Sequence, residues 1–347
     1  MMFDLNNIIR ENIKKLRPYS SARDEYKGKE GIFLDANENS HKKLLYNRYP
    51  DPLQIDLKKK ISEFKKIAPE NVFIGNGSDE AIDILFRAFC EPAKDNIIIC
   101  PPTYGMYEVS ANINNVEVLK IPLSIETFQL ETENILKAIT TNTKLIFICC
   151  PNNPTGNGVQ WNDIKLILEK FNGLVVIDEA YIDFASYRSL IPELSNYPNL
   201  VILQTLSKAW GMAGLRIGMA FASKETISVF NKIKPPYNVN VSSQKLALEI
   251  LNNVETLKEQ VNEIISERNK LSASFSELTF ILKIYPSEAN FILIKVINAL
   301  DIYNYLIRNK IIIRNRSTVT LCEECLRITI GTKEENKILL NVLKNYK

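Results

Sequence analysis

One lysine stands at an unusual point of the sequence, within the stretch TLSKAWGMAGLRIG at residues 205–218. Lys208 follows an apolar run and two hydroxyl residues, and a glycine-spaced segment then carries the chain to Arg216. Charged side chains are rarely buried without a partner. This lysine is therefore either an ordinary surface residue or a side chain held beside a group that needs an amine.

Three further motifs each follow a strand-like run. GNGSDE at 75–80 opens a helix pattern, and its glycines permit a tight turn whose free N–H groups can hold a phosphate. PNNPTG at 151–156 is a rigid turn that could hold the Asn153 amide towards a ligand. DEAY at 178–181 places Asp178 at a strand end, where a buried carboxylate needs a cationic partner. Taken singly, a structural turn explains the first motif, and a helix cap or surface acid explains Asp178.

Apolar runs and amphipathic segments alternate around these motifs. Strand-like runs rich in β-branched residues lie at 31–37, 72–77, 96–101, 144–151, 174–180, 200–205 and 217–222. Helical patterns lie at 51–67, 78–90, 103–113 and 160–171. Apolar strands separated by helices predict a mainly parallel sheet covered on both faces. Ligands of such α/β sheets bind beyond the carboxyl ends of the strands, where the motifs fall.

Past about residue 242 the pattern changes. A long helical region at 242–278 precedes a looser mixture of strands and helices, which predicts a smaller α+β domain. Thr332 and Glu335 match a capping box for the last helix. The predicted division is an N-terminal arm at 1–29 that packs with the small domain, a large domain at 30–242 and a small C-terminal domain at 243–347.

The composition is that of a soluble globular protein. The 347 residues are 46% hydrophobic and 24% charged, with a net charge of +3. Lysine clusters at 58–60 and 65–66 are interpreted as solvated helix faces rather than a nucleic-acid patch. No apolar run reaches about 18 residues, so no membrane span is expected. The first residues lack a signal-peptide pattern, which predicts a cytoplasmic protein.

Most of the six cysteines lie in apolar runs and are interpreted as small buried hydrophobes. Cys322 and Cys325 form a lone CEEC, and a zinc site needs four ligands. The single histidine, His41, is remote in sequence. No metal is therefore expected, and acid–base chemistry must fall mostly to Lys, Asp, Glu or Tyr.

The motifs gain meaning from their combination. PPTYG, PNNPTG, DEAY and SKxxGxxGxR occur in this order. The sequence thus resembles the fold-type-I pyridoxal-phosphate enzymes of the aspartate aminotransferase superfamily and, within it, the histidinol-phosphate aminotransferase family. The resemblance covers roughly residues 15–335 and is carried by the segments at 34–39, 48–50, 78–92, 101–107, 151–156, 178–184, 205–218 and 326–332. It implies a mainly parallel seven-stranded sheet with helices on both faces, and a homodimer with shared active sites.

The resemblance also assigns residues to pyridoxal 5′-phosphate. Lys208 would bind the cofactor covalently and then carry a proton between the substrate and the cofactor. Asp178 would pair with the pyridinium nitrogen, which it would keep protonated. Asn153 and Tyr181 would hydrogen-bond the ring 3′-oxygen, and Tyr104 would stack on the ring. The implied catalytic residues are Lys208, Asp178 and Tyr181.

The resemblance implies a phosphate site at the other end of the cofactor. Its ligands would be the N–H groups of Ser78 and Asp79, the hydroxyls of Thr205 and Ser207, the Arg216 guanidinium, and Tyr49 from the other subunit. Arginine suits bidentate phosphate contact. The family's usual GADE reads GSDE here. We expect this change to be tolerated, because the contact is mainly through backbone N–H groups.

The implied reaction interconverts L-histidinol phosphate plus 2-oxoglutarate and imidazole acetol phosphate plus L-glutamate, in histidine biosynthesis. Arg327 corresponds to the superfamily arginine that holds the α-carboxylate. Arg314, thirteen residues earlier, has the family's spacing for a second anion-binding arginine, although an exposed strand arginine is the alternative. Arg316 could substitute for Arg314. Tyr19 matches an arm residue that closes over the substrate, and Tyr237 is a further candidate for the imidazole pocket.

Other functions stay open at this stage. A threonine-phosphate decarboxylase-like lyase would release carbon dioxide without a keto-acid acceptor. An aromatic amino-acid aminotransferase would be indifferent to a substrate phosphate. A regulatory module without turnover would need a DNA-binding segment, and we expect neither, since the resemblance covers nearly all of these residues and Lys208, Asp178 and Arg216 are all present.

Overall fold

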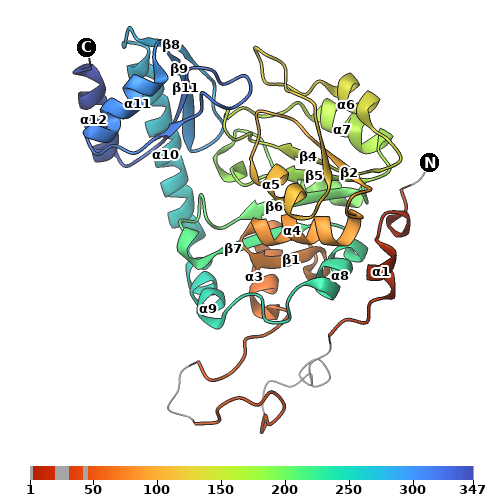
Figure 1. The fold of residues 1–347 in the computed structure, drawn as a ribbon. Coiled ribbons are helices and arrows are strands. Elements are labelled where there is room, and N and C mark those ends of the chain that lie inside the picture. Colours follow the sequence, from red (N-terminus) through yellow and green to blue (C-terminus); the bar gives the residue numbers. More distant parts are fainter. Residues whose placement is uncertain (1–2, 20–30, 42–45, 347) are drawn as a thin grey trace.

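A seven-stranded sheet lies at the centre of the larger part of the molecule (Figure 1). The structure is a computed structural model and describes residues 3–19, 31–41 and 46–346. The strands are β1 Val72–Asn76, β2 Asn96–Ile99, β3 Glu117–Lys120, β4 Thr143–Cys149, β5 Leu174–Asp178, β6 Leu200–Thr205 and β7 Ile217–Phe221. Their order is β1-β7-β6-β5-β4-β2-β3, and β7 runs antiparallel to both of its neighbours. The remaining neighbours are parallel, so the predicted fold class is confirmed.

One of the expected strands is wrong. Residues 31–37 form no strand, and Ile32 and Leu34 are 91% and 80% exposed. The seventh strand is instead β3, which pairs in parallel with β2 at the edge of the sheet. Because β3 begins with Glu117 and ends with Lys120, it contains no apolar run that the sequence analysis could recognise as a strand. Charged side chains are typical of edge strands because they discourage pairing with other chains.

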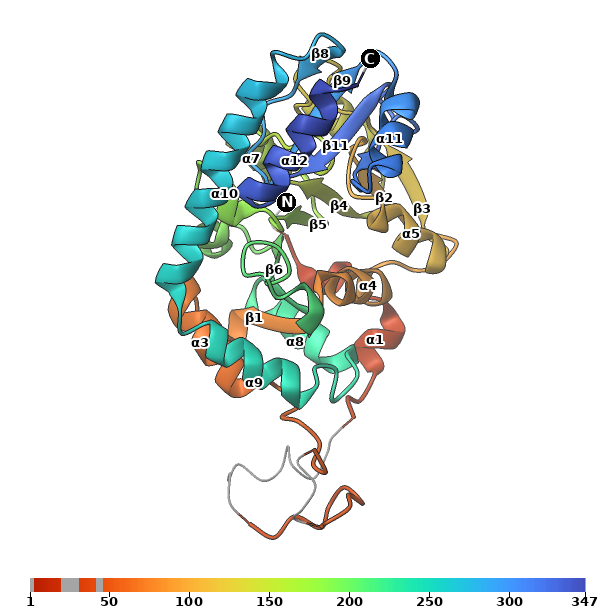
Figure 2. The same cartoon turned by 90° about the vertical axis from the view of Figure 1, so that its left-hand side faces the viewer.

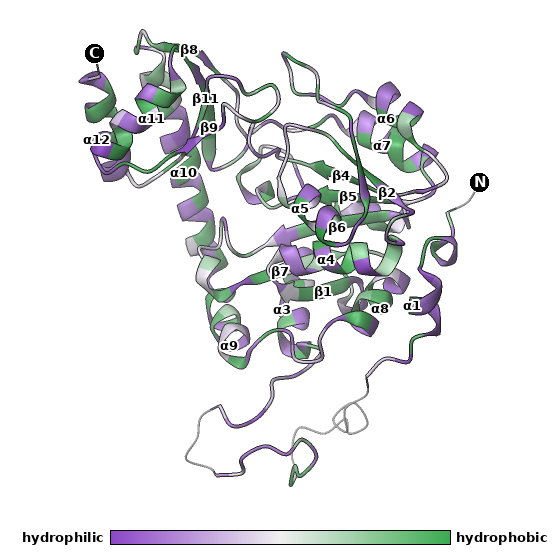
Figure 3. Ribbon diagram, in the orientation of Figure 1, coloured by the Kyte–Doolittle hydropathy of each residue, from purple (hydrophilic) through white to green (hydrophobic). Residues whose placement is uncertain are grey.

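Helices cover both faces of the sheet. One layer consists of α4 Ser78–Phe89, α5 Met106–Ile113 and α8 Lys224–Ile233, and the other of α3 Ile55–Lys65, α6 Thr132–Ala138 and α7 Trp161–Lys170. Along β4, Leu145 and Phe147 pack under the first layer, whereas Ile146 and Ile148 pack under the second. Because successive side chains point to opposite faces, a strand buried on both sides is apolar throughout, as Figure 3 shows for these strands.

A second, antiparallel sheet forms the smaller domain. Its order is β10-β11-β9-β8, from the strands β8 Ile281–Ile284, β9 Phe291–Val296, β10 Arg314–Asn315 and β11 Cys325–Thr329. The helices α11 Ala299–Arg308 and α12 Lys333–Lys344 pack on it. The capping box of α12 is confirmed, since Glu335 N–H and Thr332 Oγ1 are 3.2 Å apart and the reciprocal bond is also present.

The long helical region is two helices rather than one. They are α9 Val241–Ile250 and α10 Val254–Phe275, and the break contains Asn252 and Asn253. Asparagine competes with helix hydrogen bonds through its own side chain, which accounts for the break. Figure 2 shows α10 running along one side of the molecule from α9 towards β8. Leu257 of α10 joins the core of the large domain, and Phe275 joins that of the small domain.

The described part of the N-terminal arm lies on the large domain, not beside the small domain as expected. Ile8 is buried in the core under α4 and α8. Arg10 pairs with Glu91 at 3.1 Å, and Lys232 of α8 donates to the carbonyl of Ile13. An apolar side chain at position 8 thus has its partner on the large domain. Residues 20–29 of the predicted arm lie outside the described residues.

Two smaller expectations have different outcomes. Burial was expected for most of the cysteines, and all six are buried and form no disulfide. The interpretation of 58–60 as a solvated helix face is wrong for Lys58, which is 8% exposed, although Lys59 is exposed. None of the helices in the described ranges is long and apolar enough to cross a membrane.

Candidate active site

A cavity of about 490 Å³ opens where β4, β5 and β6 end, facing the small sheet. Twelve of the predicted site residues line it: Ser78, Asp79, Tyr104, Asn153, Asp178, Tyr181, Thr205, Ser207, Lys208, Arg216, Arg314 and Arg327. Arg316 lines it as well. The carboxyl ends of adjacent parallel strands meet at one edge of the sheet, which is why motifs far apart in sequence converge here.

Three predicted residues lie elsewhere in the protomer. Tyr49 and Tyr237 stack on each other, with ring centroids 4.4 Å apart, and line a separate surface cavity. Tyr19 is 71% exposed beside α1 Glu11–Lys15. The single chain therefore brings none of these tyrosines to the cavity, and a role for Tyr49 needs a second subunit.

One end of the cavity is built to receive an anion. Helix α4 begins at Ser78, so the N–H groups of its first turn are free at this end. Gly77 precedes it with a φ of +79°, a backbone conformation that favours glycine. Gly218 lets β7 approach this turn, because a Cβ at that position would lie 2.0 Å from the Ser78 nitrogen. Glycine at both positions thus shapes the anion site.

Side chains add to this anion-binding end. The Arg216 guanidinium lies 3.4 Å from Ser207 Oγ and 3.5 Å from Asp79 Oδ2. Ser207 N–H donates to Thr205 Oγ1 at 3.1 Å, which fixes the turn after β6. Tyr104 donates its hydroxyl to Asp79 Oδ1 at 3.2 Å. Arg216 is exposed to the cavity, so a bound phosphate can compete with the Asp79 carboxylate for it.

Lys208 points into the middle of the cavity. Its ammonium lies 5.6 Å from the centre of the Tyr181 ring. Partial desolvation by the cavity walls, and then the nearby Arg327 charge, lower the pKa of Lys208 below its ordinary value. A lysine with a lowered pKa has more of its amine in the free form, which is the form that attacks carbonyl groups.

Asp178 closes the other end of the cavity. It is buried, and burial raises the pKa of its carboxyl group, although two donors oppose that shift. Tyr107 donates its hydroxyl to Oδ2 at 2.6 Å, and the Ala180 N–H donates to Oδ1 at 3.1 Å. Sequence reasoning missed Tyr107, although it lies within the segment 101–107 that carries the resemblance, three residues after Tyr104.

Asn153, Tyr181 and Arg327 are joined in one network across the cavity. Asn153 Nδ2 donates to the Tyr181 hydroxyl at 3.3 Å, and Arg327 Nη1 donates to Asn153 Oδ1. The Arg327 guanidinium also lies 5.2 Å from the centre of the Phe291 ring. Burial and the neighbouring Arg316 lower the pKa of Arg327. The small sheet thereby supplies a fixed guanidinium to a site built on the large sheet.

The charge of the cavity is strongly unbalanced. Its lining carries five cationic side chains against the two carboxylates of Asp79 and Asp178. Such a cavity favours anionic ligands, because concave sites lined by one sign of charge focus the electrostatic potential. Within the described ranges, no group of three or more His, Cys, Asp and Glu side chains could hold a metal ion.

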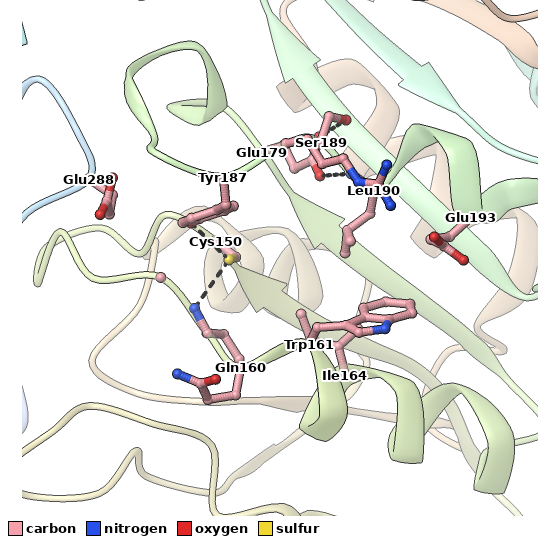
Figure 4. A pocket seen from close by; sticks show the side chains of 13 residues that line it. Cys150, Gln160, Trp161, Ile164, Glu179, Tyr187, Ser189, Leu190, Glu193 and Glu288 are labelled. Atoms are coloured by element: carbon pink, nitrogen blue, oxygen red, sulfur yellow. Dashed lines mark hydrogen bonds between the residues drawn. The ribbon is translucent and has the colours of Figure 1, made fainter.

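A neighbouring cavity of about 530 Å³ lies on the opposite face of the same strand ends (Figure 4). Cys149 and Asp178 line the first cavity, whereas the next residues along the chain, Cys150 and Glu179, line this one. Glu179 accepts hydrogen bonds from Leu190 N–H, Ser189 Oγ and Gln204 Nε2. Its carboxylate is thus engaged in holding the loop after β5, and none of the predicted site residues lies here.

Comparisons with known proteins agree with the geometry. The family model for aminotransferase class I and II matches residues 26–343. Histidinol-phosphate aminotransferases from Cytophaga hutchinsonii and Parabacteroides distasonis are 56% and 55% identical to this chain. Each comparison covers 100% of this chain and 100% of the relative. The solved structure of the Clostridium acetobutylicum enzyme has a TM-score of 0.78 at 27% identity, covering 86% of this chain and 90% of that one. The Sinorhizobium meliloti enzyme, solved with pyridoxal-5′-phosphate, has a TM-score of 0.78 at 24% identity, covering 86% and 83%. The predicted resemblance is confirmed, and the chain belongs to the aminotransferase class I and II family and, within it, to the histidinol-phosphate aminotransferases.

Proposed function

We propose that this chain transfers the amino group of L-histidinol phosphate to 2-oxoglutarate, giving imidazole acetol phosphate and L-glutamate. One observation carries the proposal: Lys208 and Asp178 line a single cavity with the arginines at 314, 316 and 327. The lysine and the acid suit an amino-transfer cofactor, and the arginines suit substrates with anionic ends. The name of the relatives gives the same substrate.

As a class I and II aminotransferase, the chain works with pyridoxal phosphate, and its donor set fits that cofactor. The free N–H groups of α4 and the Arg216 guanidinium would hold the phosphate. Lys208 would hold the aldehyde carbon, and Asn153 and Tyr181 would hydrogen-bond the ring oxygen. Asp178 is buried, so its ionised form is unfavourable without a partner of opposite charge. A cationic ring nitrogen would be such a partner.

The bound cofactor supplies an electron sink for the pair of electrons left when substrate Cα loses its proton. Lys208 takes that proton on its ε-nitrogen and delivers it again, and its lowered pKa favours the free amine that the first step needs. Asp178 holds the positive charge of the ring in place. Tyr104 would cover one side of the ring and keep water away from the reacting atoms.

The substrate is held from the small domain. Arg327 is fixed by Asn153 and Phe291, so it presents its guanidinium in a defined direction. It would bind the α-carboxylate of glutamate and, in the other half of the reaction, the phosphate of histidinol phosphate. Arg314 is the second substrate arginine of this proposal. Tyr19 and Tyr237 would join the site from the arm and from the imidazole side.

We further propose a cytoplasmic homodimer in which Tyr49 reaches the cofactor phosphate of the other subunit. Tyr49 is 49% exposed and lines a surface cavity together with Tyr237. The domain division that we propose is an arm at 1–29, a large domain at 30–242 and a small domain at 243–347.

Glutamate release tests the proposed reaction. The purified holoenzyme is mixed with L-histidinol phosphate and 2-oxoglutarate, and glutamate is measured with a coupled dehydrogenase, with K208A as the inactive control. Glutamate formed in step with loss of histidinol phosphate is the expected result. A holoenzyme that keeps its cofactor absorbance but releases no glutamate would overturn the proposal, and carbon dioxide release without a keto acid would identify a lyase.

A further inference from the structure

The two cavities on opposite faces of the strand ends differ in charge. The active-site cavity carries five cationic side chains against two carboxylates. The neighbouring cavity of about 530 Å³, here called the second cavity, carries the carboxylates of Glu179, Glu193 and Glu288 against one guanidinium, that of the exposed Arg188. A concave site lined mainly by one sign of charge gathers ligands of the other sign. The second cavity therefore favours cations, and the proposed reaction uses none of its residues.

The carboxylates of the second cavity are held by neutral groups. Glu288 accepts hydrogen bonds from the N–H and the hydroxyl of Ser186 at 2.7 and 2.9 Å, and Glu193 accepts one from Asn196 at 3.0 Å. The donors to Glu179 are also uncharged, and burial raises the pKa of this carboxyl group. Among the residues that the structure describes, no lysine or arginine nitrogen lies within 4.0 Å of these three carboxylates. A buried carboxylate is unfavourable without an opposite charge, which a cationic ligand would supply.

Two aromatic rings line the same cavity. Trp161 begins α7, and its ring packs edge-on against Tyr197 with centroids 6.0 Å apart. The Tyr187 hydroxyl lies 3.2 Å from Cys150 Sγ, and the ring lies so close to Gly158 that a Cβ there would be 2.7 Å from a ring carbon. Both rings are thus fixed by their neighbours while they remain open to the cavity. Aromatic faces attract organic cations, and tryptophan does so most strongly.

The arrangement of these groups suits an organic cation rather than a metal ion. Within the described ranges, no three His, Cys, Asp or Glu side chains could hold one metal ion together. In the view of Figure 4, Glu288 and Glu193 lie on opposite sides, with the rings of Tyr187 and Trp161 between them. The volume of about 530 Å³ lies within the roughly 300–1,000 Å³ of small-molecule sites. The ligand must therefore extend over several ångströms of cavity wall.

We propose that the second cavity is a binding site for a small organic cation, a quaternary or protonated amine with an apolar body. The carboxylates compensate its charge, and the rings of Trp161 and Tyr187 pack against its cationic end. Its apolar body lies against the aliphatic part of the lining, which is Val159, Ile164 and Leu190. This site is separate from the proposed amino transfer, whose residues line the other cavity.

Benzyltrimethylammonium is a suitable probe, because its quaternary nitrogen cannot form an imine with the cofactor. The holoenzyme is titrated at constant ionic strength, and the emission of its two tryptophans, Trp161 and Trp210, is recorded. A saturable change in emission is expected. W161F should lose this change, because Trp210 lies buried in the core and does not line the cavity. Benzoate, which has a similar ring and the opposite charge, should leave the emission of the wild-type protein unchanged.

Calorimetric titration with the same probe tests the ring and the charge separately. W161L keeps an apolar side chain but removes the aromatic face, so binding should weaken roughly 2–30-fold. E193Q removes a half-buried charge and should weaken binding roughly two- to fivefold. E169Q is the matched control, because Glu169 is exposed on α7 outside the cavity, and it should bind as the wild type does. If E193Q does not fold, E288Q takes its place.

Three results would overturn the proposal: no saturation at millimolar concentration, an equal response to benzoate, or equal binding by E193Q and E169Q. Saturating L-glutamate, a substrate of the proposed reaction, should leave the calorimetric titration in place. Loss of the titration in its presence would show that the probe binds in the active-site cavity, which also overturns the proposal. An enzyme that binds the probe but transfers no amino group would contradict the proposed function alone.

Discussion

The Tyr107 hydroxyl donates a hydrogen bond to Asp178 Oδ2 at 2.6 Å in the buried floor of the cavity. Tyr107 is itself fully buried, and its ring stacks on Phe147 with centroids 4.8 Å apart. The bond lowers the pKa of Asp178 against the larger effect of burial, which raises it. Tyr107 is therefore a positioning residue for the acid, held in place by α5 and β4.

Y107F removes this donor and keeps the ring. Without this hydrogen bond, which lowers the pKa of Asp178, the effect of burial is less opposed and the pKa rises. The acid is then protonated at a higher pH. We expect the acid limb of the cofactor-retention profile to move to higher pH, and the folded state to lose about 1–3 kcal/mol. Absorbance of bound cofactor against pH, with denaturant unfolding, measures both. Y305F, whose hydroxyl bonds a carbonyl in the small domain, is the control and should leave the limb in place.

D178N should have opposite effects on the empty and the loaded protein. The pKa of Asp178 is raised in the folded state, so the folded state without cofactor binds more protons than the unfolded chain above the usual aspartate pKa. Its stability therefore falls as pH rises through this range, and D178N should remove that fall. The same change takes away the anion that faces the cofactor, which should weaken cofactor binding roughly 10–150-fold. Unfolding curves with and without pyridoxal phosphate distinguish the two effects, and a parallel loss in both would contradict this account.

G218A tests the close approach that shapes the anion site. The added methyl group would overlap the backbone between Gly77 and Ser78, which cannot yield as a flexible side chain can. We expect a loss of stability of about 1–3 kcal/mol or more, with weaker cofactor binding. G214A is the matched control, since nothing lies within 4 Å of a Cβ at that position. Similar melting temperatures for the two variants would show that the turn has room to move.

Lys58 should make stability depend on pH in the alkaline range. Burial lowers the pKa of Lys58 to about 8, with Lys234 adding to the effect and Asp51 opposing it. Between this value and the ordinary lysine pKa, the unfolded chain binds more protons than the native state, so stability rises with pH. K58M should remove the rise and stabilise the protein at pH 7 by about 1–3 kcal/mol. Urea unfolding from pH 7 to 10 checks this, with K59M on the exposed side of the same helix as the control.

The sequence predicts the site better than it predicts the edges of the fold. Lys208, Asp178 and Asn153 follow parallel strands, so the parallel sheet is enough to bring them together. Arg216 instead precedes β7, whose antiparallel direction puts its first residue at the same edge. The strand expected at 31–37 does not form, because an apolar run becomes a buried strand only where a neighbouring strand or helix packs against it. The sequence alone does not show which segments become neighbours. Tyr107 was missed for a related reason, since a buried tyrosine is recognised as functional only when its hydrogen-bond acceptor is known. The lowered pKa of Lys58 likewise follows from its burial and from the charge of Lys234, and only the tertiary structure gives either.

The side chains of Asp178 and Glu179 point to opposite faces of the sheet, so the active site depends on the number of residues in β5. If one residue were deleted from Leu174–Ile177, every side chain after the deletion would change sides. The longer glutamate would then enter the space beneath the cofactor ring, and the aspartate would be forced into the apolar layer that Ile177 fills. The site should therefore tolerate exchanges of one residue for another within β5, whereas an inserted or deleted residue is tolerable only in the loops on either side.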